Sequence, residues 1–187
     1  LPFNIPIAHL HGGESTEGLI DEAIRHSITK MAHIHFVSTE FYGQRIVQMG
    51  EEPWRVLISG APSLDNINRF ASLSYQELKT KHGFDLTEST LLVTYHPVTL
   101  ESGQTEGRMR ELLKALDEVE QRIIFTYPNA DTEGRLIIDM IQDFAKHNER
   151  CQALTNLGSQ DYFSVMSHVD AMVGNSSSGI IEAPSFR

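Results

Sequence analysis

Two kinds of hydrophobic pattern alternate along this chain. Short runs rich in β-branched and other apolar residues are bounded by turn-forming residues, which is typical of buried β-strands. These runs predict strands at residues 7–11, 33–38, 55–59, 91–95, 122–127, 152–155 and 170–174.

Between these runs, apolar residues recur at spacings of three and four, as they do on one face of an α-helix. The spacing is clearest at Ile20, Ala23, Ile24, Ile28 and Met31, and again at Met109, Leu112, Leu113, Leu116 and Val119. Ser74 followed by Glu77 predicts a capping box at the start of a further helix, and Gly83 suits the left-handed residue at its end.

Regular alternation of strands and helices predicts an α/β fold of the doubly wound type, in which parallel strands have helices packed on the sheet faces. The longest irregular stretch, residues 59–73, interrupts this alternation and contains Gly60 and Pro62. We therefore expect a domain junction near residue 70.

The two ends of the chain suggest that both domains are incomplete. The chain starts on Leu1 without a methionine and stops at Arg187, just after a predicted helix. We expect residues 1–70 to be the C-terminal part of a first α/β domain and residues 71–187 to be the first part of a second.

Composition narrows the class of protein. With 187 residues, 40% hydrophobic and 21% charged, the chain is long and apolar enough to bury a core. A formal charge of −10 argues against nucleic acid or an anionic membrane as the main partner. The single cysteine, Cys151, fits a reducing cytoplasm, and the sequence has neither a signal peptide nor an apolar run of about 20 residues.

The loop after the first predicted strand is the first candidate for chemistry. Gly12 and Gly13 would let the backbone approach a ligand, and Glu14 follows at once. A tight turn with a solvated glutamate is the simpler alternative. Asp21 on the next helix is also acidic, and together the two carboxylates could divide base and acid work. An i,i+4 ion pair between Asp21 and Arg25 is the competing structural explanation.

Histidines on the first two strands raise the question of a metal site. His9 with His11, and His33 with His35, would each project from one face of a strand. Structural zinc usually recruits thiolates or tightly clustered donors, and nothing else in the sequence supports a metal. We favour neutral, hydrogen-bonded histidines.

Ligands of open parallel sheets collect at the carboxyl ends of the strands, where three later loops contain polar residues. Pro97 fixes the chain so that His96 stands at the end of one strand, and Asn129 follows the next strand. His96 could donate to a phosphate or act as a general acid, or it could be an ordinary surface histidine.

The third of these loops, residues 174–179, is rich in small and hydroxyl residues and enters a helix. Ser176, Ser177 and the adjoining amides could bind phosphate, while Glu182 could accept hydrogen bonds from ribose hydroxyls. A plain serine N-cap is the alternative. The sequence has no Walker loop and no Gly-x-Gly-x-x-Gly run after any predicted strand, so it lacks a visible site for a nicotinamide cofactor.

Taken in order, these loops resemble those of the UDP-N-acetylglucosamine 2-epimerase family. The resemblance covers nearly the whole chain and rests on residues 9–14, 20–30, 95–99 and 174–179. It implies two Rossmann-like domains in a GT-B-type arrangement, of which the second binds UDP. The Gly-Gly-Glu loop and the Asn-Ser-Ser-Ser-Gly turn are similar to the hydrolysing branch, which releases UDP and free N-acetylmannosamine for sialic acid synthesis.

The resemblance also implies a reaction and its residues. UDP is eliminated across C1 and C2 to give a glycal, and water is then added, with neither a metal nor another cofactor. The implied acid/base residues are Glu14 and Asp21, assisted by His96. The implied UDP-binding residues are His96, Asn129, Leu157, Ser176, Ser177 and Glu182. A cytoplasmic homo-oligomer, a dimer or tetramer, is expected.

Several alternatives remain open at this point. The substrate could be UDP-N,N'-diacetylbacillosamine, or the enzyme could be a non-hydrolysing 2-epimerase. A GT-B glycosyltransferase would share the nucleotide site but would need a sugar acceptor, and a non-catalytic module would bind a nucleotide sugar without turnover.

Overall fold

All the predicted strands form, and they form two separate parallel sheets. In the computed structural model, the described residues are 3–17, 19–83, 85–98, 103–129 and 133–186. The chain divides into two compact units, Leu1–Asp65 and Asn66–Arg187. The sequence predicts the domain junction near residue 70. The boundaries 1–70 and 71–187 stay predictions for the domains of the whole protein.

The first unit contains a three-stranded parallel sheet in the order β1-β2-β3. Its strands are β1 (Ala8–Leu10), β2 (Ile34–Val37) and β3 (Val56–Ile58), and its helices are α1 (Asp21–Met31), α2 (Glu40–Gln48), the 3₁₀ turn η1 (Pro53–Arg55) and α3 (Pro62–Ile67), which reaches the second unit. Val37 and Ile46 are fully buried between the sheet and α2.

Helix α1 differs from expectation in its packing. The apolar stripe read from the sequence is largely exposed within the described residues, since Ile20, Ile24 and Met31 keep 55%, 50% and 43% of their surface. Thr29 is the buried residue of this helix instead. The helix starts at Asp21, and the residues before it form a turn in which the Thr16 amide donates to the side chain of Glu22.

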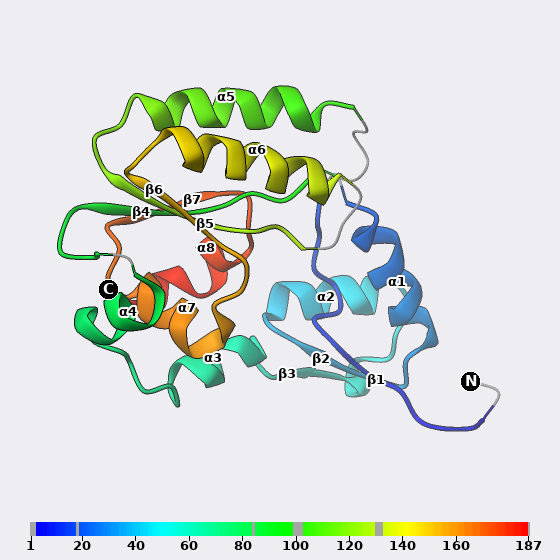
Figure 1. Cartoon of the computed structure of the whole chain (residues 1–187). Coiled ribbons are helices and arrows are strands. Elements are labelled where there is room, and N and C mark those ends of the chain that lie inside the picture. The colour runs from blue at the N-terminus through cyan, green and yellow to red at the C-terminus, as the bar shows by residue number, and fades with distance from the viewer. Residues whose placement is uncertain (1–2, 18, 84, 99–102, 130–132, 187) are drawn as a thin grey trace. The chain divides into compact units, whose positions relative to one another are not determined.

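The second unit is a four-stranded parallel sheet in the order β6-β5-β4-β7 (Figure 1). Its strands are β4 (Thr90–Thr94), β5 (Arg122–Thr126), β6 (Cys151–Leu154) and β7 (Ala171–Gly174). Its helices are α4 (Tyr75–His82), α5 (Thr105–Asp117), α6 (Gly134–His147), α7 (Gly158–Met166), the short α8 (Ser178–Ile181) and the 3₁₀ turn η2 (Ala183–Phe186).

Helices cover both faces of this second sheet, as the doubly wound prediction requires. In Figure 1, α5 and α6 lie on one face, and α4, α7 and α8 lie on the other. Alternate strand residues point to opposite faces. Thus Val93 packs in the core under α5 and α6, whereas its neighbour Leu92 packs with Leu78 of α4 and Val165 of α7. The α/β fold class is confirmed.

Local signals at α4 are also confirmed. The Ser74 hydroxyl accepts from the Glu77 amide, and the Glu77 carboxylate accepts from the Ser74 amide at 2.8 Å. Gly83 ends the helix with φ 79°. No described helix is long and apolar enough to span a membrane.

Strand order places a switch point between β4 and β7. From β4 the chain proceeds to β5 and β6 on one side, and it returns to the other side with β7. Loops leaving β4 and β7 therefore diverge at the carboxyl edge, which is where ligands bind in open α/β sheets.

Gly174, the last residue of β7, lies so close to β4 that a side chain does not fit. Its φ is 139°, and a Cβ there would lie 1.8 Å from the Thr94 carbonyl oxygen. Gly174→Ala should therefore lower the free energy of unfolding by at least about 2 kcal/mol. Gly107→Ala is the matched control, because its Cβ would have open space in helix α5, and it should raise stability by roughly 0.5–1 kcal/mol. Urea unfolding checks both, and equal stability of the two variants would contradict the close approach.

Candidate active site

The loop after β1 has a backbone path that depends on glycine. His11 and Gly13 have φ of 61° and 77°, and a Cβ on Gly13 would lie 2.2 Å from the Tyr42 carbonyl oxygen. Two arginines hold the loop by its carbonyls: Arg45 donates to Gly13 O at 2.7 Å, and Arg25 donates to Glu14 O at 3.3 Å. The end of β1 is thereby fixed against α1 and α2.

Glu14 is held by two donors inside this loop. Its Oε1 lies 2.7 Å from His11 Nδ1 and accepts from Ser38 Oγ at 2.9 Å. The side chain keeps 18% of its surface. The glutamate is therefore not the solvated turn residue of the simpler alternative, although the glycines do make a tight turn.

Asp21 is exposed at the start of α1, and the ion pair with Arg25 that the sequence suggests does not form. Among the described residues, Arg25 lies 4.0 Å from Glu22 and donates to Thr16 Oγ1 at 2.7 Å. The turn before the helix directs Arg25 back toward the loop, away from Asp21.

Glu22, unlike Asp21, is only partly exposed and accepts several hydrogen bonds, and sequence reasoning did not select it. It accepts from the Thr16 amide at 2.6 Å and from Ser15 Oγ at 3.2 Å, and it lies 3.1 Å from His26 Nε2. The Thr16 amide is the main reason that the pKa of Glu22 is lowered. This hydrogen bond depends on the path of the turn before α1, so no sequence pattern indicates that the Thr16 amide reaches Glu22.

His9 and His35 are buried in the sheet of the first unit, whereas His33 is exposed just before β2. His9 is 7% exposed, with Nδ1 3.2 Å from Thr29 Oγ1, and burial followed by the charge of His35 lowers the pKa of His9. His35 is fully buried, 3.5 Å from Glu51 Oε2. His33 Nδ1 accepts from the Ile7 amide at 3.1 Å. The described residues contain no group of three or more side chains placed to hold a metal ion.

At the switch point of the second unit, His96 and Asn175 bond reciprocally. The His96 amide donates to Asn175 Oδ1 at 2.7 Å, and Asn175 Nδ2 donates to the His96 carbonyl at 2.8 Å. His96 Nδ1 in turn accepts from the Asn129 amide at 3.4 Å. The loops after β4, β5 and β7 therefore meet, which brings His96 beside Asn129 as the sequence suggested.

An open pocket of about 530 Å³ lies next to this point, within the second unit. Asn129, Leu157 and Glu182 line it, all three of them predicted UDP-binding residues. Its other lining residues come from the ends of β5 and β6, the start of α7, and α8: Thr126, Tyr127, Pro128, Thr155, Asn156, Gly158, Ser159, Tyr162, Phe163 and Ser178.

Tyr162 and Glu182 give this pocket a polar side. Burial raises the pKa of Tyr162, against the opposing effect of hydrogen bonds with Ser178 and Thr94. Glu182 is 9% exposed. Tyr162 lies in a helix without any motif, so the sequence did not point to it.

The two predicted serines lie beside the pocket but do not line it. Ser176 Oγ accepts from the Ser178 amide at 3.3 Å, but the N-cap of α8 is Ser177, whose side chain makes no cap hydrogen bond. Ser177 is exposed. Helix α8 has 4 residues, so its dipole is weaker than the sequence suggested, and individual donors matter more.

Comparison with known proteins identifies the family of this chain. A model of the family described as UDP-N-acetylglucosamine 2-epimerase matches residues 1–187. The chain belongs to this family.

Relatives of this 2-epimerase family member include named hydrolysing enzymes. A GDP/UDP-N,N'-diacetylbacillosamine 2-epimerase (hydrolyzing) from Campylobacter jejuni is 43% identical over 100% of this chain and 49% of its own length. A UDP-N,N'-diacetylbacillosamine 2-epimerase (hydrolyzing) from Legionella pneumophila is 38% identical over 98% of this chain and 48% of its own length. The chain thus spans about half the length of these curated relatives.

A solved structure of the family shares the fold. UDP-GlcNAc 2-epimerase from Neisseria meningitidis, bound to UDP-GlcNAc, superposes with a TM-score of 0.78 over 99% of this chain and 52% of that one, at 16% sequence identity. The similarity shows two parallel, Rossmann-like α/β units of the kind found in GT-B-type 2-epimerases.

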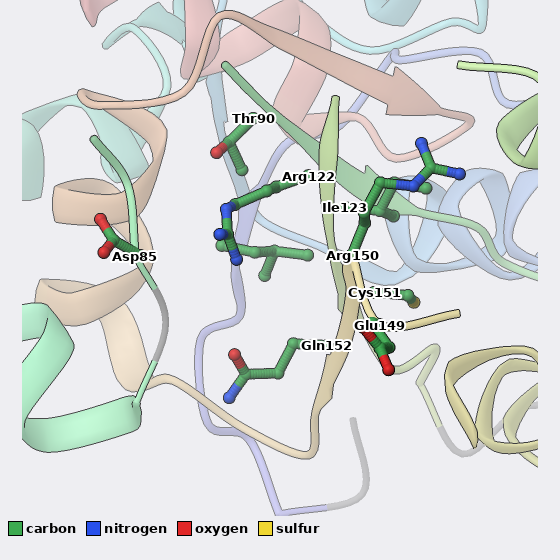
Figure 2. Close-up of a pocket in the computed structure, with 9 residues that line it drawn as sticks. Asp85, Thr90, Arg122, Ile123, Glu149, Arg150, Cys151 and Gln152 are labelled. Carbon is green, nitrogen blue, oxygen red and sulfur yellow. The ribbon is translucent and has the colours of Figure 1, made fainter. Parts of the chain in front are cut away.

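A second, smaller pocket lies at the amino-terminal edge of the second sheet, opposite the carboxyl edge (Figure 2). It has a volume of about 130 Å³, and both of its arginines are engaged. Arg122 bonds Glu88 at 2.8 Å, and Arg150 donates to the carbonyl of Asp117 at 3.3 Å. This pocket is away from the carboxyl edge where ligands bind in such sheets, so we do not assign the chemistry to it.

Cys151 lines this small pocket, and burial raises its pKa to about 12. Near neutral pH the thiolate should be much scarcer than in the unfolded chain, since the ordinary thiol pKa is lower. Iodoacetamide should therefore alkylate Cys151 far more slowly in the native protein than in urea, as measured by peptide mass spectrometry. Equal rates in both states would contradict a half-buried thiol of raised pKa.

Proposed function

We propose that the protein containing this chain is a hydrolysing UDP-sugar 2-epimerase. The first candidate substrate is UDP-N-acetylglucosamine, giving UDP and free N-acetylmannosamine. The observation that most supports this function is Glu14, a carboxylate fixed by His11 and Ser38 at the end of β1 in a member of this family. A carboxylate so fixed is suited to transfer a proton at a defined position.

The reaction would proceed in two balanced steps. In the first, a carboxylate removes the proton from C2, the C2–H electron pair forms the C1–C2 double bond, and the C1–O bond breaks to release UDP. In the second, water adds its oxygen to C1 while a proton returns to C2 from the opposite face. Neither step needs a nicotinamide, because no hydride is transferred.

Glu14 would do one part of this proton transfer, and a second carboxylate would do the other. Asp21 is the candidate from the sequence, and the geometry favours Glu22, which is fixed by the Thr16 amide. The two groups differ in environment, as acid and base pairs do in enzymes, since Glu14 is bonded by side chains, whereas Glu22 accepts from a backbone amide in addition to its side-chain partners.

The pocket of the second unit would hold the nucleotide. Leu157 would contact uracil, and Glu182 would accept from the ribose hydroxyls. Because His96 Nδ1 accepts from Asn129, a neutral His96 ring has its proton on Nε2, the arrangement needed to donate to a phosphate oxygen. The hydroxyls of Ser176 and Ser177 would donate to the diphosphate, and Ser176 can do so while its oxygen accepts from Ser178.

UDP-N,N'-diacetylbacillosamine is the second candidate substrate. It is favoured by the relatives at 43% and 38% identity, whose names specify that sugar. Supplying the intact protein with each UDP-sugar separately, and comparing kcat/KM by NMR of the released sugar, decides between them. Release of UDP without any acceptor excludes a glycosyltransferase.

We also infer a cytoplasmic homo-oligomer, a dimer or tetramer, which light scattering of the intact protein tests.

Nucleotide binding gives one test of the site. In the intact protein, Ser176→Ala and Glu182→Ala should each weaken UDP binding by on the order of 1–2 kcal/mol, because a donor or acceptor is lost. Calorimetric titration measures this effect. Glu111→Ala is the control, since Glu111 pairs with Lys114 on the exposed side of α5. Wild-type UDP affinity in the folded Ser176/Glu182 double variant would remove this pocket from the proposal.

Isotope labelling tests the mechanism itself. Turnover in heavy water should place deuterium at C2 of the free sugar, because the proton taken from C2 is exchanged before another returns. Turnover in oxygen-18 water should label the sugar at C1 and leave UDP unlabelled, because the C1–O bond breaks. NMR and mass spectrometry read both labels. Label in UDP would instead mean attack of water at phosphorus, and the protein would be a nucleotide-sugar hydrolase.

A further inference from the structure

We propose that His11 and Ser38 are positioning residues that hold Glu14 by Oε1, so that Glu14 exchanges the substrate proton through Oε2. This inference rests on the proposed function, in which Glu14 is an acid/base residue. It is based on one observation: the donor atoms of both residues lie within 2.9 Å of the same carboxylate oxygen, Glu14 Oε1.

The backbone of His11 is the first argument. Its φ of 61° lies in the left-handed region, which costs energy for a residue other than glycine. The conformation is held by a 3.0 Å hydrogen bond from the His11 amide to the Phe36 carbonyl, which extends the pairing of β1 with β2 by one residue. A turn alone would be better served by glycine, as at Gly13, so the side chain at position 11 has a use of its own.

The chemistry of the donors is the second argument. An ionised carboxylate only accepts hydrogen bonds, so His11 Nδ1 must hold a proton and Ser38 must direct its hydroxyl hydrogen at Glu14. Both bonds favour negative charge on Oε1. Among the described residues, Oε2 takes no hydrogen bond, so an arriving proton binds there.

The strand order explains how Ser38 reaches this position. Ser38 directly follows β2, whose residue Phe36 is the register partner of Leu10 at the end of β1. Parallel strands end at the same edge, so the residues just beyond β1 and β2 lie side by side there. Glu14 therefore contacts one donor from its own loop and one from the neighbouring strand.

The main experiment measures kcat and KM of intact variants with the UDP-sugar that the wild type turns over. His11→Gly removes the donor while suiting the left-handed backbone, so kcat should fall at least about 10-fold with KM within about 2-fold and the melting temperature kept. His11→Asn should restore kcat to within about 3-fold of wild type, since asparagine tolerates positive φ and its amide can donate at nearly the same place.

Ser38→Ala should lower kcat by about 3-fold or more for the same reason. Ser59→Ala is its matched control: Ser59 is the exposed serine that follows the adjacent strand β3, its hydroxyl bonds the carbonyls of Val37 and Gly60, and its loss should leave kcat unchanged. Added imidazole should partly restore His11→Gly, because the deleted ring leaves space beside Glu14.

The Glu14→Gln variant separates this inference from the proposed function. If Glu14→Gln loses turnover while His11→Gly keeps wild-type kcat, the positioning role is overturned and the proposed function stands. If His11→Gly lowers kcat equally in the wild-type and Glu14→Gln backgrounds, His11 does not act through Glu14, and the inference is again overturned. Wild-type turnover in Glu14→Gln overturns the acid/base role of Glu14 and the positioning role with it, whereas failure of the wild type to turn over either UDP-sugar overturns the proposed function.

One measurement is independent of activity. Nitrogen-15 NMR of the histidine side chains, with the His11 signals identified by their loss in His11→Gly, reports which ring nitrogen holds the proton. We expect a protonated Nδ1 whose signal shifts in Glu14→Gln. An unprotonated Nδ1 at neutral pH would overturn the proposal whatever the substrate is.

Discussion

The parallel pairing of β4 with β7 is the constraint on which the candidate nucleotide site depends. Thr94 and Gly174 are register partners, so the residues that follow them emerge side by side. His96 and Asn175, 79 residues apart in the chain, can then exchange two hydrogen bonds, and Asn129 joins them from β5. A side chain at position 174 would push the two strands apart at this edge.

Much of the fold follows from local pattern, which is why the sequence was sufficient for it. Strand runs and the Ser74–Glu77 cap depend on neighbouring residues and on burial, and both form as expected. The apolar stripe of α1 shows the limit, because periodicity identifies a face without identifying what covers it.

The candidate site was predictable in its positions and less so in its pairings. The loops after β4, β5 and β7 meet, as their positions at strand ends predict, because the carboxyl ends of parallel strands lie at one edge of the sheet. Which carboxylate Arg25 contacts depends on the turn around Thr16, and that turn favours Glu22 over Asp21. Tyr162 reaches the pocket from inside α7 through long-range packing, which no local motif encodes.

The side chain of Asn175 both accepts from the His96 amide and donates to the His96 carbonyl, and only a primary amide of this length can do both. Hydrolysis of that amide, in which water replaces ammonia, would leave a carboxylate that cannot donate and that repels the carbonyl. One of the two hydrogen bonds that align His96 would then be lost without any change in the sequence encoded for the chain. The alignment of His96 thus depends on a single amide group directly after β7.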